Sequence, residues 1–319
     1  MKPLALVAAL AISLAGGPAA ASGYPAQPIR LVVPFGAGGV TDTTARVFAE
    51  GLSKELGQPV VVENRAGAGG AIAASSVAKS RPDGYTLLVI TNGMYAVNPL
   101  IYAQLPYDPN KDFDYVAMLA NTPTILAVGP DSPHQTLTEL VEAAKARPES
   151  LSFSTAGEGS DNYQVMRLLE QASGARLLHV PYKSGPESLT AMMSRQTDAT
   201  AVSAVTAGGF IAANQIRPLA VTSSRRLAQQ PQVPTAQEAL GRPIEGGSLS
   251  GIAAPAGTPE PVLERLNAAI AAVAAGPLAQ QKVYAQGSEP VDPGRRVFEQ
   301  RVREEQAKWR ALLKPADAR

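Results

Sequence analysis

The chain has 319 residues and no cysteine, and its 28 Lys and Arg balance 27 Asp and Glu. This dispersed, near-neutral charge excludes the basic surface of a nucleic-acid-binding protein. The two histidines, His134 and His179, form no HxxxH spacing and there is no CxxC, so we expect no metal site. Without disulfides, a large hydrophobic core must hold the fold.

Residues 1–21 have the pattern of a secretory signal peptide. Lys2 precedes an apolar run over residues 4–14, and small residues follow up to an A-x-A cleavage site at 19–21. Such a run is too short for a transmembrane helix, which takes about 20 residues. Because the chain has no cysteine for lipid attachment, we expect residues 22–319 to be exported to the periplasm.

Strand-like and helix-like runs alternate along the chain. In the first part, strand-like runs at 29–35, 60–63 and 86–90 alternate with helix-like runs at 41–56 and 68–78. In the second part, strand-like runs at 151–154, 177–180, 199–204 and 218–221 alternate with helix-like runs at 160–173, 186–194 and 206–214, and helices at 259–275 and 295–313 end the chain. This order predicts an α/β fold with parallel-type sheets flanked by helices.

Two stretches are predicted to connect two domains. Residues 115–128 form two strand-like pieces broken at 121–123, and residues 247–259, GSLSGIAAPAGTP, form a second connection. The chain has the length at which single cores give way to two domains. We predict a discontinuous first domain of residues 22–122 and 224–319, and a second domain of residues 123–223.

Two turns between a strand and a helix are candidate ligand sites. The first is VPFGAGGVTD at 33–42, and the second is STAGEGSDNY at 154–163; smaller turns lie at 91–93 and 206–209. In open α/β sheets, ligands bind beyond the carboxyl ends of strands, where helix N-termini present free N–H groups. The turns therefore suit a carboxylate, although either could be an ordinary turn without a ligand.

Neither turn matches a nucleotide-binding loop. The sequence at 36–38 lacks the third glycine of a dinucleotide fingerprint, and GK[ST] occurs nowhere in the chain. We therefore expect no NAD, no ATP and no other cofactor.

Three residues near the turns have two interpretations each. Asp42 can complement the helix dipole and pair with Arg46, or it can contact a ligand that carries a hydrogen-bond donor. His179 is interpreted as a structural residue rather than a ligand. Lys183 is interpreted as a solvated side chain, although it could steer anions toward the crevice.

A serine hydrolase is the alternative enzyme class. SVAK at 76–79, SDN at 160–162 and KSG at 183–185 mimic the three signatures of serine β-lactamases, with Ser76, Ser160 and Lys183 as candidates. In those enzymes the last element is far along the chain from the SDN loop, whereas here the two are close. We therefore expect no enzyme.

Eight motifs follow one another in the order of a known family. They are YPAQPIRLVVPFGAGGVTDTTAR, VVENRAGAGG, PDGYTLL, FSTAGEGS, HVPYK, PLAVTSSRR, VPTAQEA and APAGTP. The chain resembles the Bug (TctC-like) solute receptors, the periplasmic binding proteins of tripartite tricarboxylate transporters. The resemblance covers essentially all of residues 22–319 and implies a two-domain, type II-like periplasmic binding protein with a hinged cleft.

The resemblance implies that the two domains close on a small carboxylate held by backbone amides and ordered waters. It places one wall of the site on the first turn and the other on the second. With the smaller turns and strand ends included, the candidate ligand-binding residues are Phe35, Gly38, Gly39, Thr41, Asp42, Asn92, Thr155, Ala156, Gly157, Gly159, Ser160, Asp161, Tyr182 and Ser203.

The expected role is a monomeric receptor that delivers its ligand to the membrane permease subunits of such a transporter. A ligand-binding sensor that acts with a signalling partner is the alternative, since both would use hinge closure. Glu158 and Asp161 add negative charge where relatives often carry serines and a histidine. The ligand stays open among dicarboxylic, tricarboxylic, aromatic, amino and nicotinic-type acids.

Overall fold

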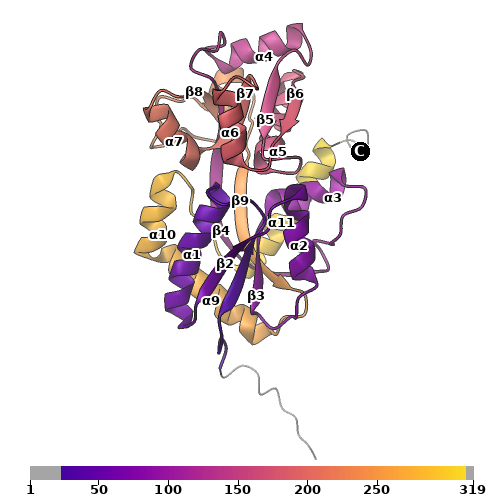
Figure 1. Cartoon of the computed structure of the whole chain (residues 1–319), viewed down its shortest axis with the longest axis vertical. Helices are drawn as coiled ribbons and strands as arrows, with labels where there is room; N and C mark the ends of the chain where they lie inside the picture. The colour runs from indigo at the N-terminus through magenta and orange to yellow at the C-terminus, as the bar shows by residue number, and fades with distance from the viewer. Residues whose placement is uncertain (1–22, 314–319) are drawn as a thin grey trace, which may run out of the picture.

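Two long strands join the two halves of the molecule. The computed structural model describes residues 23–313, and in it β4 (Phe113–Val128) and β9 (Gly247–Pro255) pair in antiparallel register from Phe113–Pro255 to Pro123–Gly247. They lie at the centre of a nine-stranded sheet of order β2-β1-β3-β9-β4-β7-β5-β6, and β8 also pairs with β4. Figure 1 shows these strands passing from the lower half into the upper half.

The first half contains three parallel strands between two helical layers. The strands are β1 (Ile29–Val33), β2 (Val60–Asn64) and β3 (Thr86–Thr91). Its helical segments are α1 (Val40–Leu56), η1 (Ala68–Gly70), α2 (Ala71–Ala78), η2 (Gly93–Val97), α3 (Asn98–Ile101), α9 (Glu260–Ala275), α10 (Pro277–Lys282), η3 (Tyr284–Gln286) and α11 (Arg295–Leu312).

Alternate residues of β1 enter different cores, as the two-residue period of a strand requires. Leu31 and Val33 pack with α1 and α9, whereas Val32 packs with α2 and α11. Both faces of this sheet are therefore covered, which explains the nearly continuous apolar run of β1.

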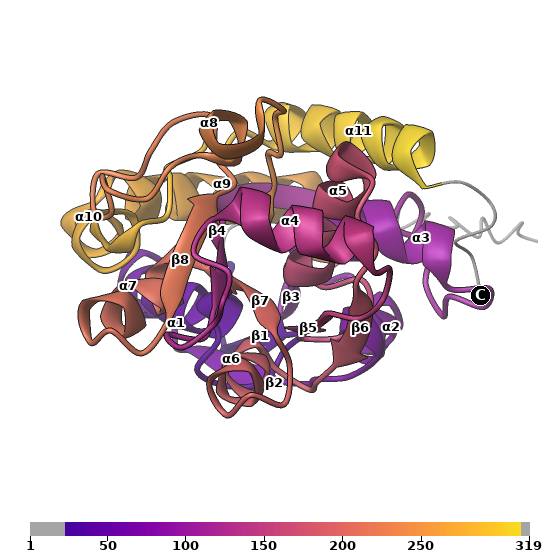
Figure 2. The same ribbon diagram turned by 90° about the horizontal axis from the view of Figure 1, so that it is seen from above.

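The second half repeats the same plan on a smaller scale. Its strands are β5 (Ser152–Thr155), β6 (Leu178–Pro181), β7 (Ala199–Ser203) and β8 (Arg217–Val221), and its helices are α4 (Leu137–Ala146), α5 (Asp161–Ser173), α6 (Gly185–Met193), α7 (Ala204–Ala212) and α8 (Ala236–Leu240). Viewed from above, α8, α9 and α11 lie on one side of the molecule and α6 and β2 on the other (Figure 2).

The predicted break at residues 121–123 is wrong. β4 is one strand, and Asn121, Thr122 and Pro123 pair with β9. The partner of Pro123 is Gly247, where a Cβ would overlap the carbonyl oxygen of Thr122, so glycine permits the close approach of the two strands. The predicted second connection likewise contains a strand, β9, over most of its length.

Part of the chain predicted for the first domain packs with the second half. Helix α8 contacts α4, and Ala236 and Ile244 belong to the same buried core as Phe153 of β5. The domain limits stay a prediction, and we propose that the chain returns to the first domain at β9, near Gly247, instead of near residue 224.

The predicted signal peptide, residues 1–21, lies outside the described residues. Among residues 23–313, no single helix is long and apolar enough to cross a membrane. Helix α9 and the segment 277–286 reach the length and composition of a membrane span only when taken together, and they are bent by 58° relative to each other.

Helix α1 packs closely on α9 at Gly51, and this contact generates a stability prediction. A Cβ at Gly51 would lie 2.6 Å from Cγ1 of Val273. We expect Gly51→Val to lower the free energy of unfolding by about 1–3 kcal/mol, because overpacking a core forces side chains and backbone to shift. Urea denaturation measures this, with the exposed Glu55→Val on the same helix as control. An equal loss in both variants would contradict the packing explanation.

Candidate ligand-binding site

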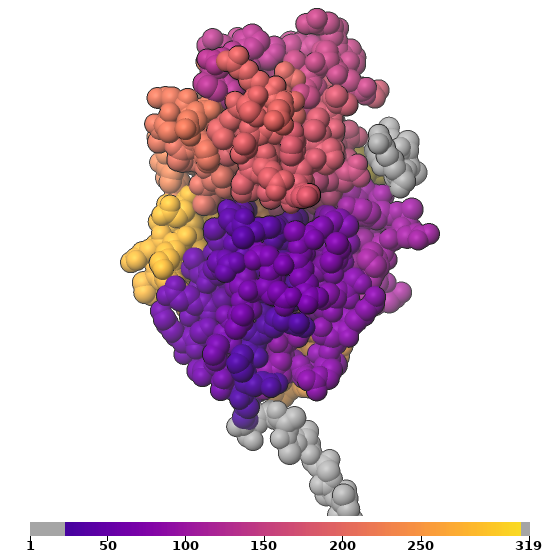
Figure 3. Space-filling view, in the orientation of Figure 1, coloured from indigo at the N-terminus to yellow at the C-terminus, as the bar shows by residue number. Residues whose placement is uncertain are grey.

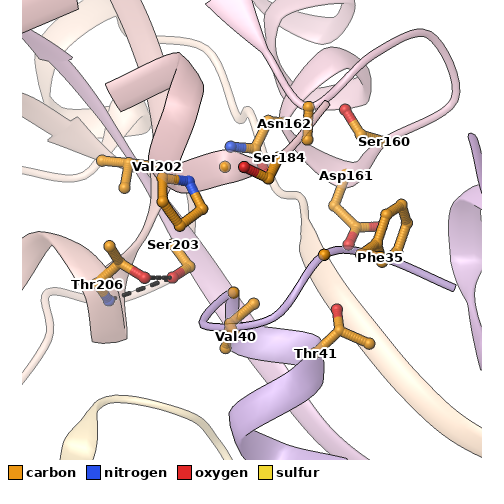
Figure 4. A pocket seen from close by; sticks show the side chains of 15 residues that line it. Phe35, Val40, Thr41, Ser160, Asp161, Asn162, Ser184, Val202, Ser203 and Thr206 are labelled. Carbon is orange, nitrogen blue, oxygen red and sulfur yellow. Dashed lines mark hydrogen bonds between the residues drawn. The ribbon is translucent and has the colours of Figure 1, made fainter. Parts of the chain in front are cut away.

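A cavity of about 60 Å³ lies between the two halves, beyond the carboxyl ends of β1, β5, β6 and β7. The first half contributes Phe35 and Thr41, and the second half contributes Ser160, Ser184 and Ser203, as Figure 4 shows. The two halves meet along a continuous seam on the face that Figure 3 shows, without a wide opening between them. A Cβ at Gly36 would lie 3.5 Å from Cβ of Ser184, so the two walls are close.

The N-termini of four helices meet at this cavity. The N-cap residues Gly39 of α1, Ser160 of α5, Ser184 of α6 and Ser203 of α7 all line it. The three serines each accept a hydrogen bond from a backbone N–H of their own helix. The other N–H groups of each first turn have no partner within the helix, and the helix dipole places partial positive charge there.

The lining contains one ionisable side chain, that of Asp161. Among the residues that the structure describes, no Lys, Arg or His lines the cavity, and Lys183 next to it is exposed. An anion in this cavity would therefore be held by backbone N–H groups, hydroxyls and helix dipoles instead of by a cationic side chain.

Asp42 organises the first turn from behind the cavity. Its carboxylate is 3% exposed and accepts hydrogen bonds from the Gly38 N–H at 3.0 Å, the Asn64 side-chain amide at 2.8 Å and Arg46 Nε at 3.0 Å. Burial raises the pKa of Asp42, but these bonds and the charge of Arg46 outweigh it and hold the pKa below its ordinary value. Because Asp42 does not line the cavity, its position fits the structural interpretation.

Thr155 and His179 hold the second turn. The Thr155 hydroxyl lies 2.7 Å from Nε2 of His179 and accepts a hydrogen bond from the Gly157 N–H at 3.1 Å. The imidazole stacks on Phe153, with ring centroids 4.9 Å apart. Gly157 and Gly159 have φ of +100° and +79°, which glycine adopts without strain. His179 therefore positions the turn, as its structural interpretation expected.

Asn92 connects three parts of the molecule. Its side-chain amide donates to Oε1 of Gln164 on α5 and to the carbonyl oxygen of Gly247, both at 3.1 Å. Its Oδ1 accepts from the N–H of Leu249 at 3.2 Å. Asn92 therefore ties β3 to α5 and to the long strand β9, and it does not line the cavity.

The structure brings half of the predicted site residues to the cavity. Those that line it are Phe35, Gly39, Thr41, Ala156, Ser160, Asp161 and Ser203. Those that stand behind or beside the lining are Gly38, Asp42, Asn92, Thr155, Gly157, Gly159 and Tyr182. Four further lining residues lie in the predicted turns but outside the candidate list: Gly36, Val40, Asn162 and Thr206. The lining residues that sequence reasoning missed are Ser184, Gly185, Pro186 and Val202.

The hydrolase candidates do not form a catalytic set. The Ser76 hydroxyl accepts from Arg65 at 2.7 Å, and Ser160 caps α5 by accepting from the N–H of Tyr163. Lys183 is exposed. Neither serine is bonded to a base, as an activated nucleophile would be. In residues 23–313, no three His, Asp or Glu side chains are placed to hold a metal ion.

The network around Asp42 predicts a pH-dependent stability. A carboxyl whose folded pKa is lowered contributes stability above its ordinary pKa and loses it as pH falls through the folded value. We expect Asp42→Ala to cost about 1–3 kcal/mol at pH 7, because buried donors lose their acceptor, and less at pH 3. Urea denaturation at both pH values measures this, with the exposed Asp131→Ala as control. An equal loss of unfolding free energy at both pH values would contradict the lowered pKa of Asp42.

Comparison with known proteins places this geometry in a family. Residues 44–317 match the model of the tripartite tricarboxylate transporter family receptors. The structure of Rpa4515 from R. palustris with adipate superposes with a TM-score of 0.87 at 34% identity, over 92% of this chain and 98% of that one.

Two further structures have the same two-half architecture. The periplasmic binding protein BugD superposes with a TM-score of 0.85 at 32% identity, over 91% of this chain and 97% of that one. MatC from Rhodopseudomonas palustris with bound malate gives 0.87 at 32% identity, over 91% and 100%. These structures confirm the predicted periplasmic-binding-protein fold, and the family consists of receptors instead of enzymes. The chain therefore belongs to the tripartite tricarboxylate transporter receptor family.

Proposed function

We propose that this protein captures a small carboxylate between its two halves in the periplasm and delivers it to the membrane permease subunits of a tripartite transporter. One observation carries the proposal: four helix N-termini meet at a cavity whose described lining has no cationic side chain. Backbone N–H groups at helix N-termini bind carboxylates, and the dipoles favour negative charge.

Two relatives support the chemical class of the ligand. Rpa4515 holds adipate and MatC holds malate, both of which are small dicarboxylates. The small volume of the cavity between Phe35 and Ser184, about 60 Å³, argues against a large ligand. Residues of both walls, among them Thr41 and Ser203, would contact such a ligand directly or through water.

Hinge closure would convert binding into a signal for the transporter. The contact between the halves supports such a movement, since the Tyr102 hydroxyl of the first half lies 3.5 Å from the carbonyl oxygen of Glu158 in the second. A ligand that bridges both walls stabilises the closed state relative to an open one and shifts the population toward it. The permease subunits would then recognise the closed form.

A thermal-shift screen tests the ligand class. Residues 22–319 are unfolded, freed of co-purified ligand, refolded and screened against small carboxylic acids and the matching amides. At about a hundredfold above Kd a ligand adds roughly 2.7 kcal/mol of stability, which raises Tm by a few degrees. We expect shifts with acids such as adipate or malate and none with their amides. A response to amides alone, or to no acid, would contradict the proposal.

A matched pair of threonines tests the site itself. Thr41 and Thr43 both lie in the first turn of α1, but Thr41 lines the cavity whereas Thr43 is exposed. We expect Thr41→Val to weaken carboxylate binding about tenfold or more, because a hydrogen bond to a charged group is worth about 1.5–3 kcal/mol. Thr43→Val should bind like the wild type. Calorimetric titration measures the affinity of both variants. Equal affinities would show that the carboxylate does not bind at Thr41.

A further inference from the structure

A buried acid joins the two halves beside the cavity. Asp161 is the first residue of α5, is 7% exposed and lines the cavity (Figure 4). Its carboxyl group lies near the backbone N–H of Gly93 and the hydroxyl of Ser248, whose Oγ has no hydrogen-bond partner in the structure. Gly93 lies in the first half and Ser248 on β9, which joins the halves, whereas Asp161 begins a helix of the second half, so the carboxyl group lies at the seam between them.

The halves fit tightly at this point. A Cβ on Gly93 would overlap the carbonyl oxygen of Gly159, and a Cβ on Gly159 would overlap Oδ1 of Asn98. The bond from Asn92 to Gln164 crosses the same seam at 3.1 Å, and Nε2 of Gln164 lies 3.4 Å from Oδ1 of Asp161. In this structure the tight fit therefore leaves the Asp161 carboxyl group little contact with water.

Among the described residues that line the cavity, no Lys or Arg lies beside Asp161. Burial raises the pKa of Asp161 to about 7, against the lowering effect of the Ser248 hydroxyl, the Gln164 amide and the Gly93 N–H. Arg46 is bound to Asp42, and Arg167 is bound to Glu170. The titratable or charged groups on the neighbouring described segments are Asp42 and Arg46 on α1, Tyr95 on η2, Glu158 before α5, Tyr163, Arg167 and Glu170 on α5, Lys183 before α6, and Arg301, Glu304, Glu305 and Lys308 on α11.

We propose that the halves close on a carboxylate only when Asp161 carries a proton. Asp161 is thereby a specificity-determining residue of the cavity. The proposal rests on the proposed function, because it assumes an anionic ligand in the same cavity. An ionised Asp161 and a carboxylate would repel each other there with little water to screen them. The ligand-bound closed state therefore holds Asp161 protonated, and the proton comes from solvent and returns to it on opening.

Calorimetric titration of adipate and malate tests the coupling. The chain of residues 22–319 is titrated between pH 7 and 8.5 in buffers of different ionisation enthalpy. We expect uptake of up to one proton, so that Kd rises by up to about tenfold per pH unit. Asp161→Asn, which keeps the shape without the charge, should bind with no uptake and a nearly constant Kd. Glu158→Gln, an exposed acid in the same turn, should behave as the wild type.

A second measurement needs no ligand. Small-angle scattering of the ligand-free protein at pH 6 and 8.5 should show the wild type expanding at pH 8.5, whereas Asp161→Asn stays compact at both. Asp161→Ser replaces the asparagine variant if that variant does not fold.

The two measurements separate the two proposals. Carboxylate binding without proton uptake, together with a wild type equally compact at both pH values, would overturn the role of Asp161 and leave the proposed function intact. Expansion at pH 8.5 that depends on Asp161, with no binding of any carboxylate in the screen, would support the role of the acid in closure and count against the proposed function.

Discussion

The antiparallel pairing of β4 with β9 is the constraint on which the rest of the molecule depends. β4 belongs to both halves, because it pairs with β9 at its beginning and with β7 and β8 at its end. An isolated bridge between Asn121 and Glu289 adds a further connection at the same level. The ladder of backbone hydrogen bonds fixes how the two halves are placed along these strands, and with it the contacts across the cavity.

The cavity follows from one structural unit used four times. In each unit a helix begins with its N-cap at the cavity, just after a strand ends. A short turn separates strand and helix in three of the units, as before Ser160, whereas Ser203 both ends β7 and caps α7. Groups behind the lining fix the turns: Asp42 holds the first through three partners, and Thr155 with His179 holds the second. The most polar of these supporting side chains, Asp42 and His179, do not line the cavity.

The sequence allowed the fold and about half of the lining to be predicted. Periodicity located the strands, and the rule that ligands lie beyond strand ends located Phe35, Thr41 and Ser160. Neither the periodicity nor this rule could separate residues that face the cavity from those that hold the turn in place. Gly38 and Gly39 are the same residue type, and only the direction of the backbone places Gly39 in the lining and Gly38 behind it. β4 was missed as one strand because Asn and Pro near its middle are typical of turns, and the permissive partner, Gly247, is far away in sequence.

A local signal for one missed segment was present. Ser184 is followed three residues later by Glu187, with Pro186 between them, which is the usual start of a helix. The preceding Tyr182 and Lys183 are conspicuous in the sequence by aromaticity and charge, whereas an N-cap serine is not. In a site built from backbone groups, the start of a helix is more informative than the charges beside it.

The absence of a cationic side chain in the described lining has a consequence for the release of cargo. The field of a helix terminus falls off within about one turn and is weakened further by water, whereas a lysine would keep its full charge whether the halves are open or closed. Attraction supplied by Gly39, Ser160, Ser184 and Ser203 is therefore short-ranged and strongest while water is excluded. A partner that separates the halves would therefore weaken ligand binding by the same movement. No ion pair to a lysine or arginine of the described lining would have to be broken as well.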